Sequence, residues 1–247
     1  FDSMGRLIAA EGADFGGRRL TRTNLETGKA EIIAGLYEGR PFNSPNDISI
    51  DEKGRIYFSD PRYLGHEPID QPVMGVYRID PDGAIERIIS DAGKPNGVCV
   101  APDQQSLYVV SNDNGNTGLV RMGDAPYHKG RMALLAYDLA LDGTATFREV
   151  LVDYAPEDGP DGLVADADGN LYVAVRDATR PGIVVYSPKG KELAYIPTPV
   201  VPTNAAFGHG EDSKTLYVTY GGGNLPDNPG ILARIKVNKD GYHLPKP

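Results

Sequence analysis

The chain has 247 residues and a formal net charge of -9, which would repel a phosphate backbone and excludes nucleic acid as a predicted partner. No stretch approaches the roughly 20 apolar residues that cross a bilayer, so we expect no membrane contact and leave the compartment open between cytoplasm and periplasm. The 30 glycines and 20 prolines favour short strands joined by tight turns, and the length suits one domain over residues 1–247.

The first predicted strand is residues 5–10, Gly-Arg-Leu-Ile-Ala-Ala, and a complete structural unit follows further along the chain. That unit starts with a polar anchor and a short apolar strand at residues 45–50. An Asp/Gly turn at residues 51–54 leads to the second strand, Ile56-Tyr57-Phe58. Two short apolar strands around such a turn predict a β-hairpin.

The same unit recurs three more times. Its anchors are Pro-Asn-Gly at 95–97, Pro-Asp-Gly at 160–162 and Pro-Thr-Asn at 202–204. Each second strand carries a central Tyr, and the residues before these tyrosines are spaced by 51, 64 and 45 positions: Ile56, Leu107, Leu171 and Leu216. Repeats of this length are typical of the blades of a β-propeller.

An outer pair of strands follows each of the first three hairpins, at residues 75–79 with 85–89, 134–139 with 147–152, and 182–186 with 192–196. Four strands per unit match a propeller blade, whereas a β-sandwich would not explain the regular anchors. Leu7 lies 49 residues before Ile56, so residues 5–10 match a second strand whose anchor would precede residue 1. We therefore expect an all-β propeller with about five blades visible and its first blade absent or truncated.

The anchor residues Asn46, Asn96 and Asp161 are the candidate functional site. Because the first strand of each blade lies nearest the propeller axis, equivalent positions in successive blades form a ring around the channel. Oxygen-bearing side chains around one axis favour a hard cation, Ca²⁺ before Mg²⁺ or Mn²⁺, rather than Zn²⁺ or copper. Any one Asn-Gly or Asp-Gly pair alone is better explained as a turn, and it is the repetition that indicates a metal site.

These motifs resemble the SMP-30/gluconolactonase/luciferin-regenerating family over nearly the whole chain. The resemblance is carried by residues 43–47, 56–61, 95–97 and 160–162. It implies a six-bladed propeller that holds a catalytic Ca²⁺ through a Glu, two Asn-type positions and an Asp. Asn46, Asn96 and Asp161 match three of these ligands. The Glu has no counterpart here, because Glu11 is in the wrong register, so we expect the sixth blade to precede residue 1.

The resemblance also implies an enzyme that opens a sugar lactone such as gluconolactone. Ca²⁺ would polarise the carbonyl, and Asp161 would deprotonate a metal-bound water, with direct attack by Asp161 as an alternative. Residues at or after the ends of the second strands are expected to rim the pocket and bind substrate: Glu11, Asp60, Tyr63, Asn112, Arg176 and Tyr220. For Arg176, a solvated loop arginine paired with Asp177 is an equal alternative.

Two other functions stay open from the sequence. One is a phosphotriesterase-like hydrolase on the same metal site, and the other is a non-catalytic propeller that binds a ligand or partner, since a fold alone does not give function. The Gly- and Asn-rich insertion at residues 112–131 is either a lid over the pocket or a surface excursion. The predicted partner is a small-molecule lactone, and the sequence does not indicate the oligomeric state.

Overall fold

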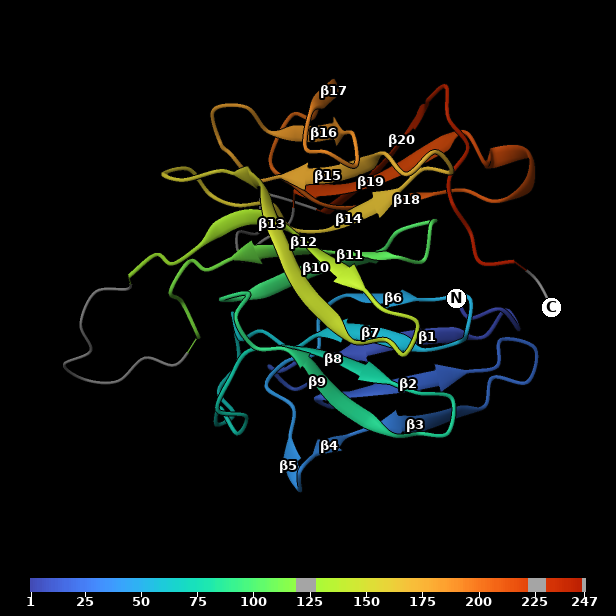
Figure 1. Cartoon of the computed structure of the whole chain (residues 1–247), viewed down its shortest axis with the longest axis vertical. Helices are drawn as coiled ribbons and strands as arrows, with labels where there is room; N and C mark the ends of the chain where they lie inside the picture. Colours follow the sequence, from blue (N-terminus) through green and yellow to red (C-terminus); the bar gives the residue numbers. More distant parts are fainter. Residues whose placement is uncertain (119–127, 222–229, 246–247) are drawn as a thin grey trace.

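The computed structural model describes residues 1–118, 128–221 and 230–245 (Figure 1). The central part of the predicted insertion, residues 119–127, lies outside the described residues. Within the described ranges, the chain forms five successive antiparallel sheets of three or four strands. Each sheet is built from strands that follow one another in the sequence, and Figure 1 shows the sheets fanned in chain order.

The strands of the five sheets closely follow the predicted units. The first sheet holds β1 (Leu7–Glu11), β2 (Arg19–Thr23) and β3 (Ala30–Ala34), and a ribbon of β4 (Leu36–Tyr37) and β5 (Arg40–Pro41) follows it. The second holds β6 (Ile48–Ile50), β7 (Ile56–Ser59), β8 (Val76–Ile79) and β9 (Ile85–Ile89). The third holds β10 (Pro95–Val100), β11 (Ser106–Asn112), β12 (Met132–Leu139) and β13 (Ala145–Asp153).

The last two sheets complete the described fold. The fourth holds β14 (Leu163–Ala165), β15 (Leu171–Val175), β16 (Gly182–Tyr186) and β17 (Glu192–Pro197). The fifth holds β18 (Pro202–Phe207), β19 (Thr215–Gly221) and β20 (Gly230–Lys236), with a 3₁₀ turn η1 (Gly210–Asp212) between the first two. The prediction of an all-β propeller is confirmed, with four strands in the second, third and fourth sheets and three in the first and fifth among the described residues. Among the described residues, no helix has the length and apolar character needed to cross a membrane.

The inner hairpins close on turns that the sequence specifies. Asp51 accepts hydrogen bonds from the backbone N–H groups of Lys53 and Arg55 at 3.0 and 2.9 Å, and Gly54 takes a φ of 79°. The hairpin of the fourth sheet repeats this arrangement with Asp166 and with Gly169 at a φ of 84°. Asp can bond the backbone two residues on and glycine tolerates positive φ, so these turns set the pairing of the strands.

The hydrophobic core lies between neighbouring sheets. Four clusters of buried side chains fill the four gaps between the five sheets. In the third sheet Leu107 packs toward the second sheet and Tyr108 toward the fourth, because successive residues of a strand point to opposite faces. This two-sided burial explains the continuous apolar runs of the second strands, and it stacks the sheets so that their first strands face a common centre.

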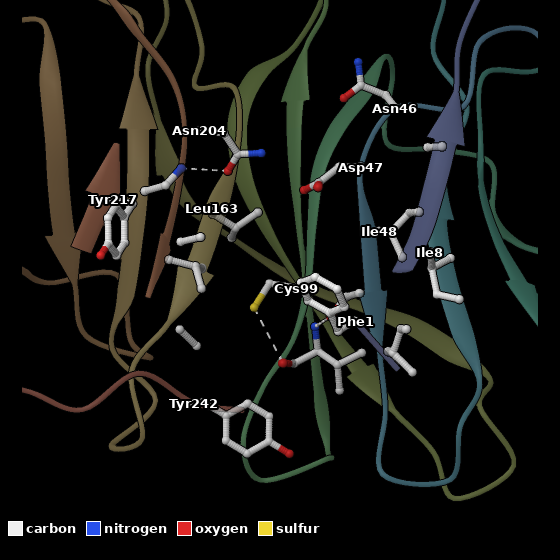
Figure 2. A pocket seen from close by; sticks show the side chains of 18 of the residues that line it. Phe1, Ile8, Asn46, Asp47, Ile48, Cys99, Leu163, Asn204, Tyr217 and Tyr242 are labelled. Atoms are coloured by element: carbon white, nitrogen blue, oxygen red, sulfur yellow. Dashed lines mark hydrogen bonds between the residues drawn. The ribbon is translucent and has the colours of Figure 1, made fainter. Parts of the chain in front are cut away.

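The first strands of four sheets line a cavity of about 620 Å³ (Figure 2). Its wall is formed largely by residues of β6, β10, β14 and β18, together with residues of β1 and the C-terminal segment: Ile48, Cys99, Leu163, Ala205, Ile8 and Tyr242. The fold therefore brings equivalent positions of successive repeats close together, which is the condition for a site built from the anchors.

Candidate functional site

The anchors of the third, fourth and fifth sheets are joined through their backbones. Gly97 N–H donates to the carbonyl of Asp161 at 3.1 Å, and Gly162 N–H donates to the carbonyl of Thr203 at 2.9 Å. A Cβ atom at Gly97 would lie 2.6 Å from that same Asp161 oxygen. Gly97 and Gly162 are thus required for close approach of the neighbouring sheet, rather than for a turn.

The second sheet is joined to the third by a side chain instead. Asp47 stands at the position that Gly97 and Gly162 hold in their repeats, and its Oδ2 accepts a hydrogen bond from Val98 N–H at 2.9 Å. Burial raises the pKa of Asp47 to about 7, while the N–H groups of Val98 and Ile48 act in the opposite direction. The nearby charge of Asp161 raises it further, so the two carboxylates lie close enough to interact.

Two of the three predicted ligands are in direct contact. The Asn96 side chain hydrogen-bonds the Asp161 carboxylate. Arg176 Nη1 donates to Asp161 Oδ2 at 3.0 Å. Burial raises the pKa of Asp161, and the charge and hydrogen bond of Arg176 and the hydrogen bond of Asn96 counteract that effect. The partner of Arg176 is therefore Asp161 and not Asp177, whose carboxylate instead accepts from Thr179.

Asn46 is placed differently from Asn96 and Asp161. Its backbone N–H donates to the carbonyl of Ser59 at 2.9 Å, which fixes the anchor to the end of β7. Its side chain is exposed and lines the cavity, above Asp47 in Figure 2. The cavity wall thus includes Asn46 and Asp47, whereas Asn96 and Asp161 lie outside it, with the Asp161 charge close enough to act on Asp47.

Tyr63 lies beside the contact between Asn96 and Asp161. Its hydroxyl donates to the carbonyl of Asn112 at 3.0 Å and is hydrogen-bonded to the Asn96 side chain. Burial is the main cause that raises the Tyr63 pKa, and the charge of Asp161 adds to it. The predicted pocket residue is therefore protonated at neutral pH and in reach of the candidate ligands.

Lys94 is a site neighbour that sequence reasoning missed. It is buried, its ammonium lies 4.8 Å from the centre of the Tyr63 ring, and it donates to Asn114 Oδ1 at 2.9 Å and to the Asn116 carbonyl at 2.6 Å. Burial lowers the pKa of Lys94 to about 8. Its position directly before Pro95-Asn96 was the available signal, but a lysine in a loop is by default exposed.

Two predicted rim residues, Asp60 and Asn112, hydrogen-bond the backbone beside the anchors. Asp60 is fully buried, and its two oxygens accept from the backbone N–H groups of Asn43 and Ser44 at 2.8 and 2.6 Å. The buried Asn112 amide donates to the carbonyls of Gly159 and Pro160 at 2.9 and 3.0 Å. Both side chains hold backbone that leads directly into an anchor.

The two remaining predicted rim residues are held within their own sheets. Glu11 Oε2 accepts from Arg19 Nε at 2.7 Å, which links β1 to β2. Tyr220 pairs with Pro202 across β18 and β19 and packs against the cluster between the fourth and fifth sheets. The structure thus gathers Asn96, Asp161, Tyr63 and Arg176 into one connected group and leaves Glu11 and Tyr220 outside its network of contacts.

The donor chemistry of the group suits a hard cation. A cluster of three or more His, Cys, Asp or Glu side chains that could hold a metal is absent from the described residues. The candidate donors are instead a mixed set of carboxylate and amide oxygens: Asn46, Asp47, Asn96 and Asp161. Calcium accepts such neutral and charged oxygens in flexible geometry, whereas zinc prefers sulfur and imidazole.

Comparison with known proteins gives consistent matches across the chain. A family model described as "SMP-30/Gluconolactonase/LRE-like region" matches residues 1–221. A gluconolactonase of Zymomonas mobilis is 30% identical over 223 residues, which are 84% of this chain and 56% of the relative. The chain spans about half the length of the curated relatives it matches.

Two solved structures share the fold. One, described as a putative gluconolactonase, superposes with a TM-score of 0.76 at 30% identity and covers 98% of this chain and 74% of that chain. The other is XC5397 of Xanthomonas campestris, described as a gluconolactonase, with a TM-score of 0.70 at 28% identity and coverage of 88% and 66%.

Proposed function

Because the chain belongs to the SMP-30/gluconolactonase/LRE-like family, we propose that it hydrolyses the ring ester of a sugar lactone such as gluconolactone. The observation that carries this proposal is the half-buried Asp161 carboxylate, in contact with Asn96 and Arg176 where three anchors meet. The names of the relatives from Zymomonas mobilis and Xanthomonas campestris support a lactone as the substrate class.

We further propose that a divalent cation, Ca²⁺ before Mg²⁺ or Mn²⁺, binds between Asn46, Asn96 and Asp161. The support is the set of oxygen donors, the backbone linkage between the anchors of Asn96 and Asp161, and the hydrogen bond from Val98 N–H to Asp47, the residue after Asn46. A cation at this position would polarise the lactone carbonyl and make a water molecule more acidic. Asn46 and Asn96 would hold it without adding charge, and Asp161 would supply the negative charge that a divalent ion needs.

Side chains of this protein would carry out proton transfer, orientation and substrate binding. Asp161 accepts the proton of the attacking water, whose oxygen forms the new bond to the carbonyl carbon while the ring C–O bond breaks. The proton then reaches the leaving oxygen, so that the product is the open hydroxy acid. The Tyr63 hydroxyl donates to the carbonyl of Asn112 and contacts Asn96, which fixes the amide beside Asp161. Arg176 lies where it can bind a carbonyl or hydroxyl oxygen of the lactone.

The test is a hydrolysis assay on gluconolactone that follows acid release. We expect turnover above the spontaneous rate with added Ca²⁺, loss of turnover in EDTA and recovery when Ca²⁺ is restored. The matched control is Asp177→Asn, an exposed carboxylate that caps its own loop through Thr179 and should leave turnover unchanged. A rate equal to background at saturating Ca²⁺ would refute the lactonase proposal.

A further inference from the structure

The Arg176 guanidinium already binds the carboxylate that the proposed cation needs. Its Nη1 lies 3.0 Å from Asp161 Oδ2, although Asp177 is its neighbour in sequence. Arg176 directly follows β15, whose last residue is Val175, and Asp161 lies 15 positions earlier in the chain. Asp161 lies just before β14, which pairs with β15, so the Arg176 and Asp161 side chains meet across the inner hairpin of the fourth sheet.

This contact balances the charge of Asp161. Burial of a carboxylate disfavours its ionised form unless a positive charge or hydrogen-bond donors compensate for the lost water. Arg176 is the first of the influences that offset burial at Asp161, and Asn96 is the other. The guanidinium therefore stabilises the charged form of the Asp161 carboxylate, as a bound metal ion would.

A guanidinium and a divalent cation repel each other when they share one carboxylate. Calcium binds oxygen at about 2.3–2.6 Å, so a cation on Asp161 would lie within a few ångströms of Arg176 and the repulsion would be weakly screened. Lys94 adds a further positive charge near this position, but it is buried and fixed by Asn114 and Asn116. The Arg176 side chain is 33% exposed and begins a loop, so it is the charge that can move away.

We propose that Arg176 and the cation compete for Asp161, and that cation binding releases Arg176 to contact the lactone. This inference rests on the proposed function, because it takes the cation site and the lactone from it. The exchange links the two binding events: the cation enters as the guanidinium leaves Asp161, and the freed donors then face the substrate. Arg176 is thus proposed as a substrate-binding residue whose charge, before its release from Asp161, lowers cation affinity.

Calcium affinity measured by isothermal titration calorimetry tests the exchange directly. We compare the unmodified chain with Arg176→Gln, which removes the charge, and Arg176→Lys, which keeps it. We expect Arg176→Gln to bind Ca²⁺ about tenfold more tightly and Arg176→Lys to bind it as the unmodified chain does. The matched control is Arg180→Gln, an exposed arginine on the same loop that pairs with Glu192 and should leave the affinity unchanged.

A second readout separates this inference from the proposed function. At saturating Ca²⁺ we expect Arg176→Gln to raise the KM for gluconolactone several-fold with little change in kcat. Equal or weaker Ca²⁺ affinity in Arg176→Gln would overturn the exchange and leave the lactonase proposal standing. Failure of all four proteins to bind Ca²⁺ would overturn both the exchange and the cation site.

Discussion

Asp60 and Asp161 are two aspartates near the anchors, and they differ in which groups hydrogen-bond their carboxylates. Burial raises the pKa of both. Asp60 is bound by the fixed backbone N–H groups of Asn43 and Ser44, whereas Asp161 is bound by the side chains of Arg176 and Asn96. Backbone partners cannot leave without unfolding the loop, but side-chain partners can exchange for a ligand. This contrast in partners, rather than burial or residue type, is why we propose Asp161 and not Asp60 as the functional acid.

The largest expected effect comes from Asp161→Asn, which tests the functional half of this comparison. It should reduce kcat for gluconolactone about 100-fold or more, because a positioned acid–base group typically contributes a factor of 10²–10⁴. Its free energy of unfolding should change by less than about 1 kcal/mol, since the partner Arg176 is partly exposed. Urea denaturation and steady-state kinetics on the same protein check both halves. A stability loss as large as that of an Asp60 variant would show that Asp161 is a structural acid.

Asp60→Ala tests the structural half and should act mainly on stability. Removing both acceptors leaves the N–H groups of Asn43 and Ser44 unpaired in a largely buried loop, which costs about 2–4 kcal/mol of unfolding free energy. The control is Asp70→Ala, whose ion pair with Arg18 is partly exposed on the aspartate side and should contribute about 1 kcal/mol. An unchanged unfolding free energy together with a raised KM would instead support the sequence-based prediction that Asp60 binds substrate.

The repeat pattern was sufficient to predict the fold because it depends on local chemistry. Turn residues such as Asp51 and Gly54, and apolar second strands buried on both faces, determine the hairpins and their stacking. Equivalent anchors therefore had to meet, and the contact between Asn96 and Asp161 follows from that geometry. The choice of Ca²⁺ and the ligand role of Asn46 stay predictions, because they depend on how an ion would be held.

The sequence could not separate supporting side chains from those that face the site. Asn112 ends β11, and Asp60 and Arg176 directly follow β7 and β15, but which of these side chains turns inward depends on the loops that pack over them. Lys94 and Asp47 were missed because their contacts come from neighbouring sheets. The Tyr63 ring packs against Lys94, and Val98 N–H of β10 donates to Asp47. A pattern within one repeat contains no information about such contacts between repeats.

The smallest expected effect is a pH dependence of stability that arises from Asp60. Burial raises its pKa in the folded protein to about 7, whereas an aspartate in an unfolded chain titrates near 3.9. Between these values the folded state holds a proton that the unfolded state has released, so the free energy of unfolding falls as pH rises through this window and levels off above pH 7. The pKa of about 7 already includes the two N–H donors, which favour the ionised form, so we expect a loss of about 2–3 kcal/mol between pH 5 and 7.5.

Urea denaturation of the unmodified chain and of Asp60→Asn across this range isolates that contribution. Asp47 also has a folded pKa of about 7, and it titrates in both proteins, so its effect cancels in the difference between the two curves. The curve for Asp60→Asn should be flatter than that of the unmodified chain, and the gap between them should change between pH 5 and 7. Parallel curves would mean that Asp60 is ionised throughout, held by its two backbone donors and the charges of Arg18 and Arg62. In that case burial would not measurably raise the Asp60 pKa. Asp60 and Asp161 would then differ only in whether their hydrogen-bond partners can be exchanged for a ligand.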